Sequence, residues 1–265
     1  MKAMNFIKYL AGGPAAKAAR RKPHDPNGYD GIGFDDIDVR HGARSVLEIE
    51  SLRLGERRIG LIGDNGSGKS TMLRLMNGLL LPTRGRVVVA GLDTTLNRKD
   101  VPAKVGFIFQ NPDHQLIFPT VGEEIAFGPA ERGSPASEAR AQAISLLADH
   151  GCADWVDRNV NELSGGQKQL VCILAILATR PSILLMDEPF ASLDLPTRLH
   201  LSRRIMALPQ QIVMASHDFE LLVQFDRLIW LDAGRIRADG QPAEVLPAYR
   251  AHAAMTAAND LVMAC

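Results

Sequence analysis

A glycine-rich segment at residues 63–70, GDNGSGKS, limits the possible folds of this chain more than any other feature, because it fits the pattern G-x-x-x-x-G-K-[ST]. The apolar stretch 58–62 before it predicts a strand, and residues 70–79 after it predict a helix. Glycines let backbone N–H groups approach phosphate oxygens without Cβ clashes, and a helix N-terminus adds positive potential. The segment therefore predicts a strand–loop–helix unit of an α/β fold that binds a nucleoside triphosphate.

The polar residues of this phosphate loop (residues 63–70) have defined chemical uses. Lys69 would bring a charge to the β- and γ-phosphates, and the Ser70 hydroxyl would ligate Mg²⁺. The alternative, a plain glycine turn, is disfavoured by the flanking strand and helix. The predicted ATP-binding residues are those of the loop and the next position: Gly63, Asp64, Asn65, Gly66, Ser67, Gly68, Lys69, Ser70 and Thr71.

Two carboxylates follow a short apolar run at residues 183–186. Asp187, at the end of this predicted strand, can hold Mg²⁺ through water beside the phosphate loop. Glu188 can then polarise an attacking water as a general base. Many strands end in Asp or Glu, so the pair is a weak signal alone, but downstream of a phosphate loop it predicts a hydrolytic site.

Composition excludes several other classes of protein. The 265 residues carry 30 Lys and Arg against 30 Asp and Glu, a balance that gives no support to a nucleic-acid-binding surface. The longest apolar run, residues 170–178, is far short of the roughly 20 residues that cross a bilayer. Cys152, Cys172 and Cys265 have no metal or redox spacing and are expected to be buried thiols.

Predicted strands and helices alternate along the chain, which favours a parallel sheet covered by helices. Residues 38–50 predict two short strands around a turn at His41-Gly42, and residues 111–162 predict an inserted helical region with a helix near 137–150. The Ala-rich tail after residue 246 predicts a helix with no evident chemistry. The other predicted strands are 86–90, 105–109, 183–186, 212–215 and 227–231, and a further helix is predicted at 169–177.

The first 22 residues contain six basic groups and no acid. Met4, Phe6, Ile7 and Leu10 fit a short basic amphipathic helix on an anionic membrane surface. A disordered leader is the alternative, favoured by the glycines and prolines between residues 12 and 23. A secretory signal is disfavoured, because Lys8 interrupts the apolar stretch.

A second glycine-rich helix start comprises Leu163, Ser164, Gly165, Gly166 and Gln167. Such a helix N-terminus is an anion-binding surface, although an ordinary helix capped by Ser164 has the same local sequence. A chain with one phosphate loop has little use for a second γ-phosphate site of its own. The segment makes sense when two copies of the chain face each other head to tail.

With this segment, LSGGQ, residues 34–246 closely resemble the ABC ATPases. The order of motifs also matches: the phosphate loop, Gln110 as the Q-loop glutamine, the LSGGQ signature, the acid pair, the D-loop and His217 as the switch histidine. The resemblance implies a P-loop NTPase with a RecA-like core, an antiparallel β subdomain and an inserted α-helical subdomain. The domains expected are a basic extension at 1–32, the ATPase domain at 33–246 with its helical subdomain near 111–180, and a helical tail at 247–265.

The resemblance also implies roles for individual residues. Catalysis would use Glu188, His217 and Gln110, and Mg²⁺ would be held with water by Ser70, Gln110 and Asp187. The signature residues would act on ATP bound by the partner protomer, and the D-loop would contribute Ser192 and Asp194. The family usually stacks an aromatic ring on adenine near the start of the domain. Here His41 occupies that stretch, either as the stacking ring or as a plain turn residue.

The stretches 111–115, 118–121 and 123–128 resemble the energy-coupling-factor (ECF) transporters for vitamins and metals. That resemblance implies a homodimer or heterodimer of ATPases, with ATP and Mg²⁺ as cofactors, a transmembrane coupling subunit and a substrate-binding membrane subunit. Residues 193–198 and 225–250 resemble biotin-type ATPases more than cobalt or nickel types. The resemblance also implies a peripheral protein on the cytoplasmic side of the cell membrane. The alternative is a soluble ABC ATPase acting on nucleic acid or ribosomes, which is disfavoured because the chain has one ATPase copy and no long coiled coil.

Overall fold

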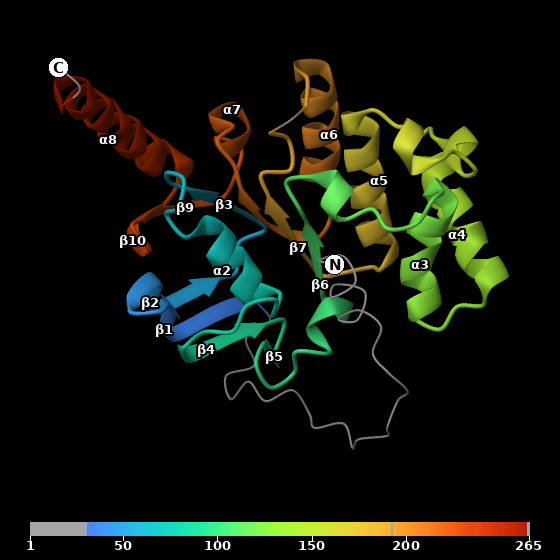
Figure 1. Ribbon diagram of the computed structural model, residues 1–265, viewed down its shortest axis with the longest axis horizontal. Coiled ribbons are helices and arrows are strands. Elements are labelled where there is room, and N and C mark those ends of the chain that lie inside the picture. Colours follow the sequence, from blue (N-terminus) through green and yellow to red (C-terminus); the bar gives the residue numbers. More distant parts are fainter. Residues whose placement is uncertain (1–30, 192, 264–265) are drawn as a thin grey trace.

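A computed structural model describes residues 31–191 and 193–263 of the chain (Figure 1). The basic N-terminal extension, Ser192 of the D-loop and Cys265 lie outside these residues, so the predictions for them are not addressed by the structure. Within the described part, no helix combines the length and apolarity that a bilayer-spanning segment needs. Cys152 and Cys172 are free and buried, as expected.

The larger of two sheets contains the phosphate-loop strand. Its order is β10-β9-β3-β8-β7-β6, and the five strands from β9 to β6 run parallel to one another. The parallel sheet predicted from the sequence is therefore confirmed, with an antiparallel edge strand added. The strands are β3 (Arg58–Ile62), β6 (Val105–Ile108), β7 (Ile183–Asp187), β8 (Gln211–Ala215), β9 (Arg227–Asp232) and β10 (Arg235–Gly240).

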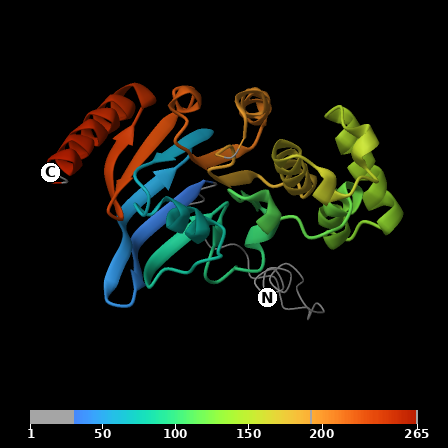
Figure 2. The same ribbon diagram turned by 45° about the horizontal axis from the view of Figure 1, so that its top comes forward.

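The smaller sheet is antiparallel, with the order β2-β1-β4-β5. Its long hairpin, β1 (Ile32–His41) and β2 (Arg44–Leu54), turns where the sequence predicted a turn and is longer than the predicted strands. β4 (Arg84–Val89) and β5 (Leu92–Asp93) complete it. Helix α2 (Lys69–Met76) packs between the two sheets, beside β2, β4, β7 and β8 (Figure 2).

The parallel strands are buried on both faces, which explains their nearly continuous apolar sequences. Along β3, Ile62 joins the apolar cluster on the side of the inserted helices, whereas Ile59 and Leu61 join the cluster that contains α2 and the smaller sheet. The same alternation runs along β7, where Leu184 and Leu185 face opposite clusters. Apolar packing on both faces therefore holds the strands of the sheet, and with them the loops that follow their ends, in place.

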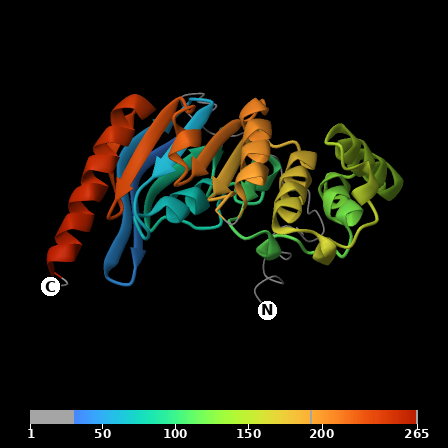
Figure 3. The same ribbon diagram turned by 90° about the horizontal axis from the view of Figure 1, so that it is seen from above.

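Three helices lie in the region that the sequence predicted as helical. They are α3 (Val121–Glu131), α4 (Ala136–Asp149) and α5 (Gly165–Ala178), and α3 contacts both of the others. Short 3-10 turns at Pro112–His114, Ala153–Trp155 and Val160–Glu162 connect them to each other and to the sheet, and another lies at Val101–Ala103. The α3–α4 pair forms one end of the elongated molecule and α8 forms the other (Figure 3).

Several elements were not predicted. α6 (Leu195–Ala207) buries few apolar residues, and α7 (Phe219–Leu222) is only one turn long. β10 is an edge strand without a buried position. These three elements therefore lack the regular apolar spacing by which a sequence predicts a helix or a strand. The C-terminal helix α8 (Pro242–Met263) starts ahead of the predicted boundary at residue 247. Its first two turns bury Val245, Leu246 and Tyr249 against the core.

Candidate functional site

Four of the predicted site segments follow the carboxyl ends of neighbouring strands in the parallel sheet. β3, β8, β7 and β6 are successive neighbours in it, and the site residues follow their carboxyl ends. The phosphate loop follows β3, His217 follows β8, the acid pair ends β7, and Gln110 follows β6. This edge is the ordinary position of ligand sites in open α/β sheets. Strand order thus brings together segments that are far apart in the sequence.

The phosphate loop folds as its glycines require. Gly63, Gly66 and Gly68 have φ angles of 142°, 79° and 109°, which residues with a Cβ rarely adopt. A Cβ at Gly63 would also overlap the carbonyl oxygen of Leu231 on β9. Gly68 precedes the first turn of α2, so the loop ends at a helix N-terminus with its amide groups directed at the loop. Glycine is therefore structurally necessary at these positions.

Lys69 is buried at the centre of this loop. Its Nζ donates to the carbonyl oxygens of Gly63, at 2.6 Å, and Asp64, at 3.0 Å. An ammonium group has three donors, so two carbonyls leave one for a phosphate oxygen. Burial lowers the pKa of Lys69, and the nearby carboxylates of Glu188, Asp187 and Asp64 oppose that shift. The arrangement places a cation inside the curve of the loop.

Ser70 and Asp187 lie next to each other beside the phosphate loop. The Ser70 hydroxyl donates to Asp187 Oδ1 at 3.1 Å, which joins the first turn of α2 to the end of β7. A hydroxyl and a carboxylate are hard oxygen ligands, and Mg²⁺ typically binds one or two such protein groups while keeping water and phosphate oxygens in its shell. The residues present therefore fit Mg²⁺ bound together with a nucleotide. No cluster of three or more His, Cys, Asp or Glu side chains suited to a metal occurs among the described residues.

Glu188 is held in an unusual backbone conformation. Its φ of 49° lies in the left-handed region, and its N–H donates to the Ala215 carbonyl at 3.0 Å. This turn directs the carboxylate out of the strand toward His217, whose Nε2 lies 3.1 Å from Glu188 Oε1. The carboxylate is mostly buried and the imidazole is partly exposed. The two candidate catalytic groups therefore contact each other directly.

The signature segment (residues 163–167) forms the start of α5. Ser164 is the N-cap, and its side chain and that of Gln167 make a reciprocal capping box. A Cβ at Gly166 would overlap Thr197 on α6, whereas a Cβ at Gly165 would enter open space. Among the described residues, no hydrogen bond joins the signature segment to the phosphate loop of the same chain. The second glycine-rich helix start is therefore separate from the first.

The remaining predicted residues occupy different positions. Gln110 lies in the loop after β6, and His41 is exposed at the end of β1 in the hairpin, opposite Arg44. Asp194 caps α6 by accepting the Thr197 N–H at 2.9 Å, and hydrogen bonds from Thr197 lower the pKa of this carboxyl group. The adenine and D-loop roles of these residues remain predictions.

One residue that contacts the phosphate loop was not predicted from the sequence. Tyr249, on α8, donates its hydroxyl hydrogen to Asp64 Oδ1 at 2.9 Å. The residues are 185 positions apart, and the tail lacks any motif that would signal the contact. A lone tyrosine in an Ala-rich segment was the signal available in the sequence, and it is a weak one.

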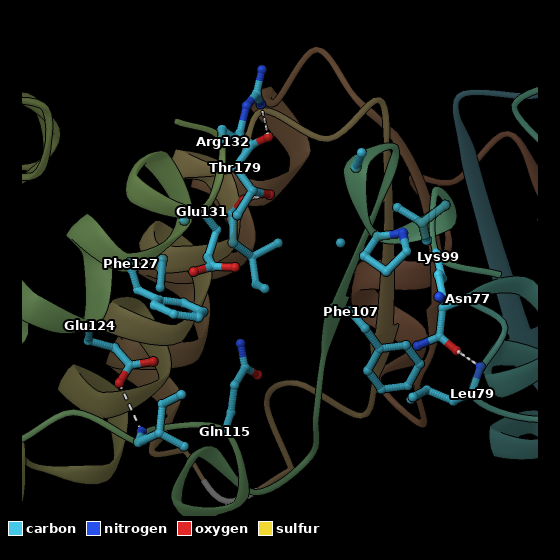
Figure 4. Close-up of a pocket in the computed structure, with 18 residues that line it drawn as sticks. Asn77, Leu79, Lys99, Phe107, Gln115, Glu124, Phe127, Glu131, Arg132 and Thr179 are labelled. Atoms are coloured by element: carbon cyan, nitrogen blue, oxygen red, sulfur yellow. Dashed lines mark hydrogen bonds between the residues drawn. The ribbon is translucent and has the colours of Figure 1, made fainter. Parts of the chain in front are cut away.

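A groove of about 310 Å³ lies between the sheet and the inserted helices (Figure 4). Phe107 on β6 and Phe127 on α3 line opposite sides, with Gln115 at one end. The Glu124 carboxylate beside the groove is buried and accepts the backbone N–H groups of Ile117 and Phe118. Burial raises its pKa, and these two hydrogen bonds oppose the rise. The groove is thus mainly apolar with a few charged groups.

Comparison with known proteins relates this geometry to a family. Residues 51–191 match the ABC transporter family. The chain is 53% identical to a biotin transport ATP-binding protein, BioM, of Rhodobacter capsulatus over 82% of this chain and 93% of that protein. It resembles the solved structure of cbiO1 from Clostridium perfringens, part of the ABC transporter complex cbiONQ. The TM-score is 0.73 at 26% identity, and the match covers 82% of this chain and 90% of that one. It also resembles a dimeric structure of the ATP-binding cassette MJ0796 bound to ADP and Pi. The TM-score is 0.71 at 26% identity, and the match covers 80% of this chain and 98% of that one.

Proposed function

Because this chain belongs to the ABC transporter ATP-binding proteins and is an ATPase, we propose that its ATP hydrolysis powers an ECF-type importer through separate membrane subunits. The observation that carries this proposal is the meeting of four strand ends at one site. There Lys69 and Ser70 lie beside Asp187, and Glu188 contacts His217. A cation, a hydroxyl, a metal-binding carboxylate and a base–imidazole pair are the groups that phosphoryl transfer to water requires.

Different residues of the chain would bind the phosphates, hold the metal ion and activate the attacking water. Lys69 and the amide groups at the start of α2 bind the β- and γ-phosphates. Ser70 and Asp187 would hold Mg²⁺ bound together with ATP, and the ion would supply positive charge against the phosphate oxygens. Glu188 takes a hydrogen bond from the attacking water and polarises it, and His217 fixes the direction of that carboxylate and contacts the γ-phosphate. Gln110, in the loop after β6, would contact the bound metal and the attacking water.

ATP closes a pair of protomers in this proposal. The signature segment of one copy caps the triphosphate bound in the phosphate loop of the other, so each site needs both copies. The open surroundings of Gly165 and the separation of the two glycine-rich helix starts support this arrangement. The resemblance to a dimeric cassette supports it as well. Hydrolysis removes the γ-phosphate contacts and lets the protomers part.

The groove in Figure 4 is the surface we assign to the transmembrane coupling subunit. It is lined by β6 and by Gln115 and Ile117 of the segment that follows Gln110, so a membrane partner seated there would respond to changes at the nucleotide. The chain would therefore sit at the cytoplasmic face of the membrane as a peripheral subunit. Its domain division would be an ATPase core at 33–246 with a helical subdomain near 111–180.

We favour biotin as the cargo over cobalt or nickel ions. The 53% identity to a biotin transport ATP-binding protein supports a vitamin, whereas the likeness to cbiO1 is at 26% identity. The ATPase itself does not contact cargo, so its own residues bear on this choice only through similarity. A role on nucleic acid or ribosomes has no supporting observation beyond the shared ATPase core.

Capture of membrane partners tests the proposal. The full chain, added to detergent-solubilised membranes of its own cells, should retain a coupling subunit and a substrate-binding subunit. Glu131→Lys, in the groove, should lose both partners while keeping ATP binding. Glu138→Lys makes the same charge change on α4 away from the groove and serves as the control. Retention by Glu131→Lys equal to that by Glu138→Lys would reject the groove, and capture of ribosomes or nucleic acid instead would reject the transporter.

A further inference from the structure

The C-terminal helix α8 contacts the core through a small part of its length. Val245, Leu246 and Tyr249 are buried, whereas most of the residues that follow up to 257 are exposed. Tyr249 is thus the last buried residue of α8 among those up to residue 257. The helix then extends away from the sheet (Figure 1). A tyrosine at such a point needs a partner for its hydroxyl group.

Two aromatic rings fix the orientation of Tyr249. The ring of Trp230, on β9, lies edge-on with its centroid 5.4 Å away, and that of Phe219, at the start of α7, lies edge-on at 5.8 Å. Trp230 pairs in the sheet with Ile62, the residue before the phosphate loop, and Phe219 follows His217 by two positions. The tyrosine ring therefore packs against two elements that adjoin the nucleotide site.

The hydroxyl of this fixed ring reaches the phosphate loop. It donates to Asp64 Oδ1, and the backbone carbonyl of Asp64 in turn accepts from Lys69 Nζ at 3.0 Å and from the Ser67 N–H at 3.1 Å. Asp64 is thus held by its side chain from α8 and holds Lys69 by its backbone. A shift of Asp64 would move an acceptor that orients the ammonium group toward the phosphates.

We infer that Tyr249 is a positioning residue for ATP binding: through Asp64 it fixes the phosphate loop in the shape that directs Lys69 at the triphosphate. This inference rests on the proposed ATP site and extends it to α8. The phenol remains a donor at physiological pH, because burial and the bond to Asp64 raise its pKa to about 12. A contact that merely attached α8 to the core would instead stabilise the fold without affecting nucleotide affinity.

Tyr249→Phe separates these two roles, because it removes the hydroxyl group and keeps the ring between Trp230 and Phe219. The measurement is the Kd of a fluorescent ATP analogue for the full chain, with the melting temperature taken alongside. We expect Kd to rise about threefold to tenfold, within the net worth of one ordinary hydrogen bond because Tyr249 acts on ATP only through Asp64 and Lys69, with a melting temperature close to that of the wild type. Thr256→Val, which removes a hydroxyl bonded to the His252 carbonyl of the same helix, should leave Kd unchanged.

A double-mutant cycle with Asp64→Ala then assigns the effect to the pair. If the contact acts as inferred, Tyr249→Phe should add nothing to the loss caused by Asp64→Ala. An unchanged Kd in Tyr249→Phe, a Kd that changes only in step with the melting temperature, or fully additive effects in the cycle would each overturn the inference. Absence of ATP binding by the wild-type chain would be a different result, because it would reject the proposed function itself.

Discussion

The chain begins two helices with a serine- and glycine-rich turn, and these two helix starts are built in opposite ways. The phosphate loop is closed on itself: its glycines have positive φ, Lys69 folds back onto two loop carbonyls, and Asp64 is held by Tyr249. The signature segment has a regular capping box, and Gly165 borders open space. Both present amide groups to an anion. The difference fits the proposal that the phosphate loop encloses a phosphate by itself, whereas the signature segment is a surface that a second copy of the chain completes.

The largest expected effect comes from removing Glu188, the proposed general base for ATP hydrolysis. Glu188→Gln should lower turnover by about 10²–10⁴-fold, the usual contribution of a general base, while ATP still binds. ATP would then accumulate between two copies, which size-exclusion chromatography would detect as a dimer. Amide hydrogen exchange should slow at both helix starts in that dimer. Turnover close to that of the wild type would remove Glu188 from its role, and protection at the phosphate loop alone would contradict the comparison.

Removal of a single ammonium group should affect the two helix starts unequally. Lys69→Ala should weaken ATP binding to the monomer by about tenfold to a hundredfold, because charged hydrogen bonds inside the closed loop are lost. Lys168→Ala removes an ammonium next to the signature segment, where it pairs with Asp113 at 2.7 Å. That control should leave the monomer's affinity within about twofold. Equal losses in the two variants, measured by isothermal titration calorimetry, would show that both helix starts bind ATP within one chain.

The two neighbouring glycines of the signature segment should separate stability from function. Gly166→Ala should lower the free energy of unfolding by about 1–3 kcal/mol, because its Cβ would overlap Thr197. Thr197→Ser, which removes the obstructing methyl group, should recover most of that loss in the double variant. Gly165→Ala should unfold at the same denaturant concentration as the wild type and still hydrolyse ATP more slowly. Full activity in Gly165→Ala would mean that the open space beside it is not an ATP-facing surface.

The smallest effect concerns the hydrogen bond from Tyr249 to Asp64 in the phosphate loop, which is lost at high pH. The pKa of Tyr249 is raised from 10.0 to about 12, so its contribution to stability is complete below pH 10 and is lost as the pH rises through about 12. Between these values the wild type should lose slightly more unfolding free energy than Tyr249→Phe. Urea titrations at three pH values would measure the difference. Parallel pH profiles would show that the tyrosine proton is not linked to folding.

Local chemistry explains how much of this site could be predicted. The phosphate loop, the acid pair and the capped start of α5 are short segments whose glycines, caps and apolar runs specify local structure. The approach of Ser70 to Asp187 also followed from the rule that strand ends meet at one edge of a parallel sheet. The left-handed turn at Glu188 could not be read from the sequence, because the Ala215 carbonyl that holds it lies on another strand. The Tyr249–Asp64 contact depends likewise on where a distant helix packs.

The central claim, that each ATP is enclosed by two copies of the chain, is tested most directly by mixing two inactive variants. Lys69→Ala has an intact signature segment, and Ser164→Arg has an intact phosphate loop. One site in each mixed dimer combines the intact halves, so an equal mixture should recover up to about a quarter of wild-type ATPase activity. Activity no higher than the sum of the separate variants, in a mixture shown to form mixed dimers, would contradict the account.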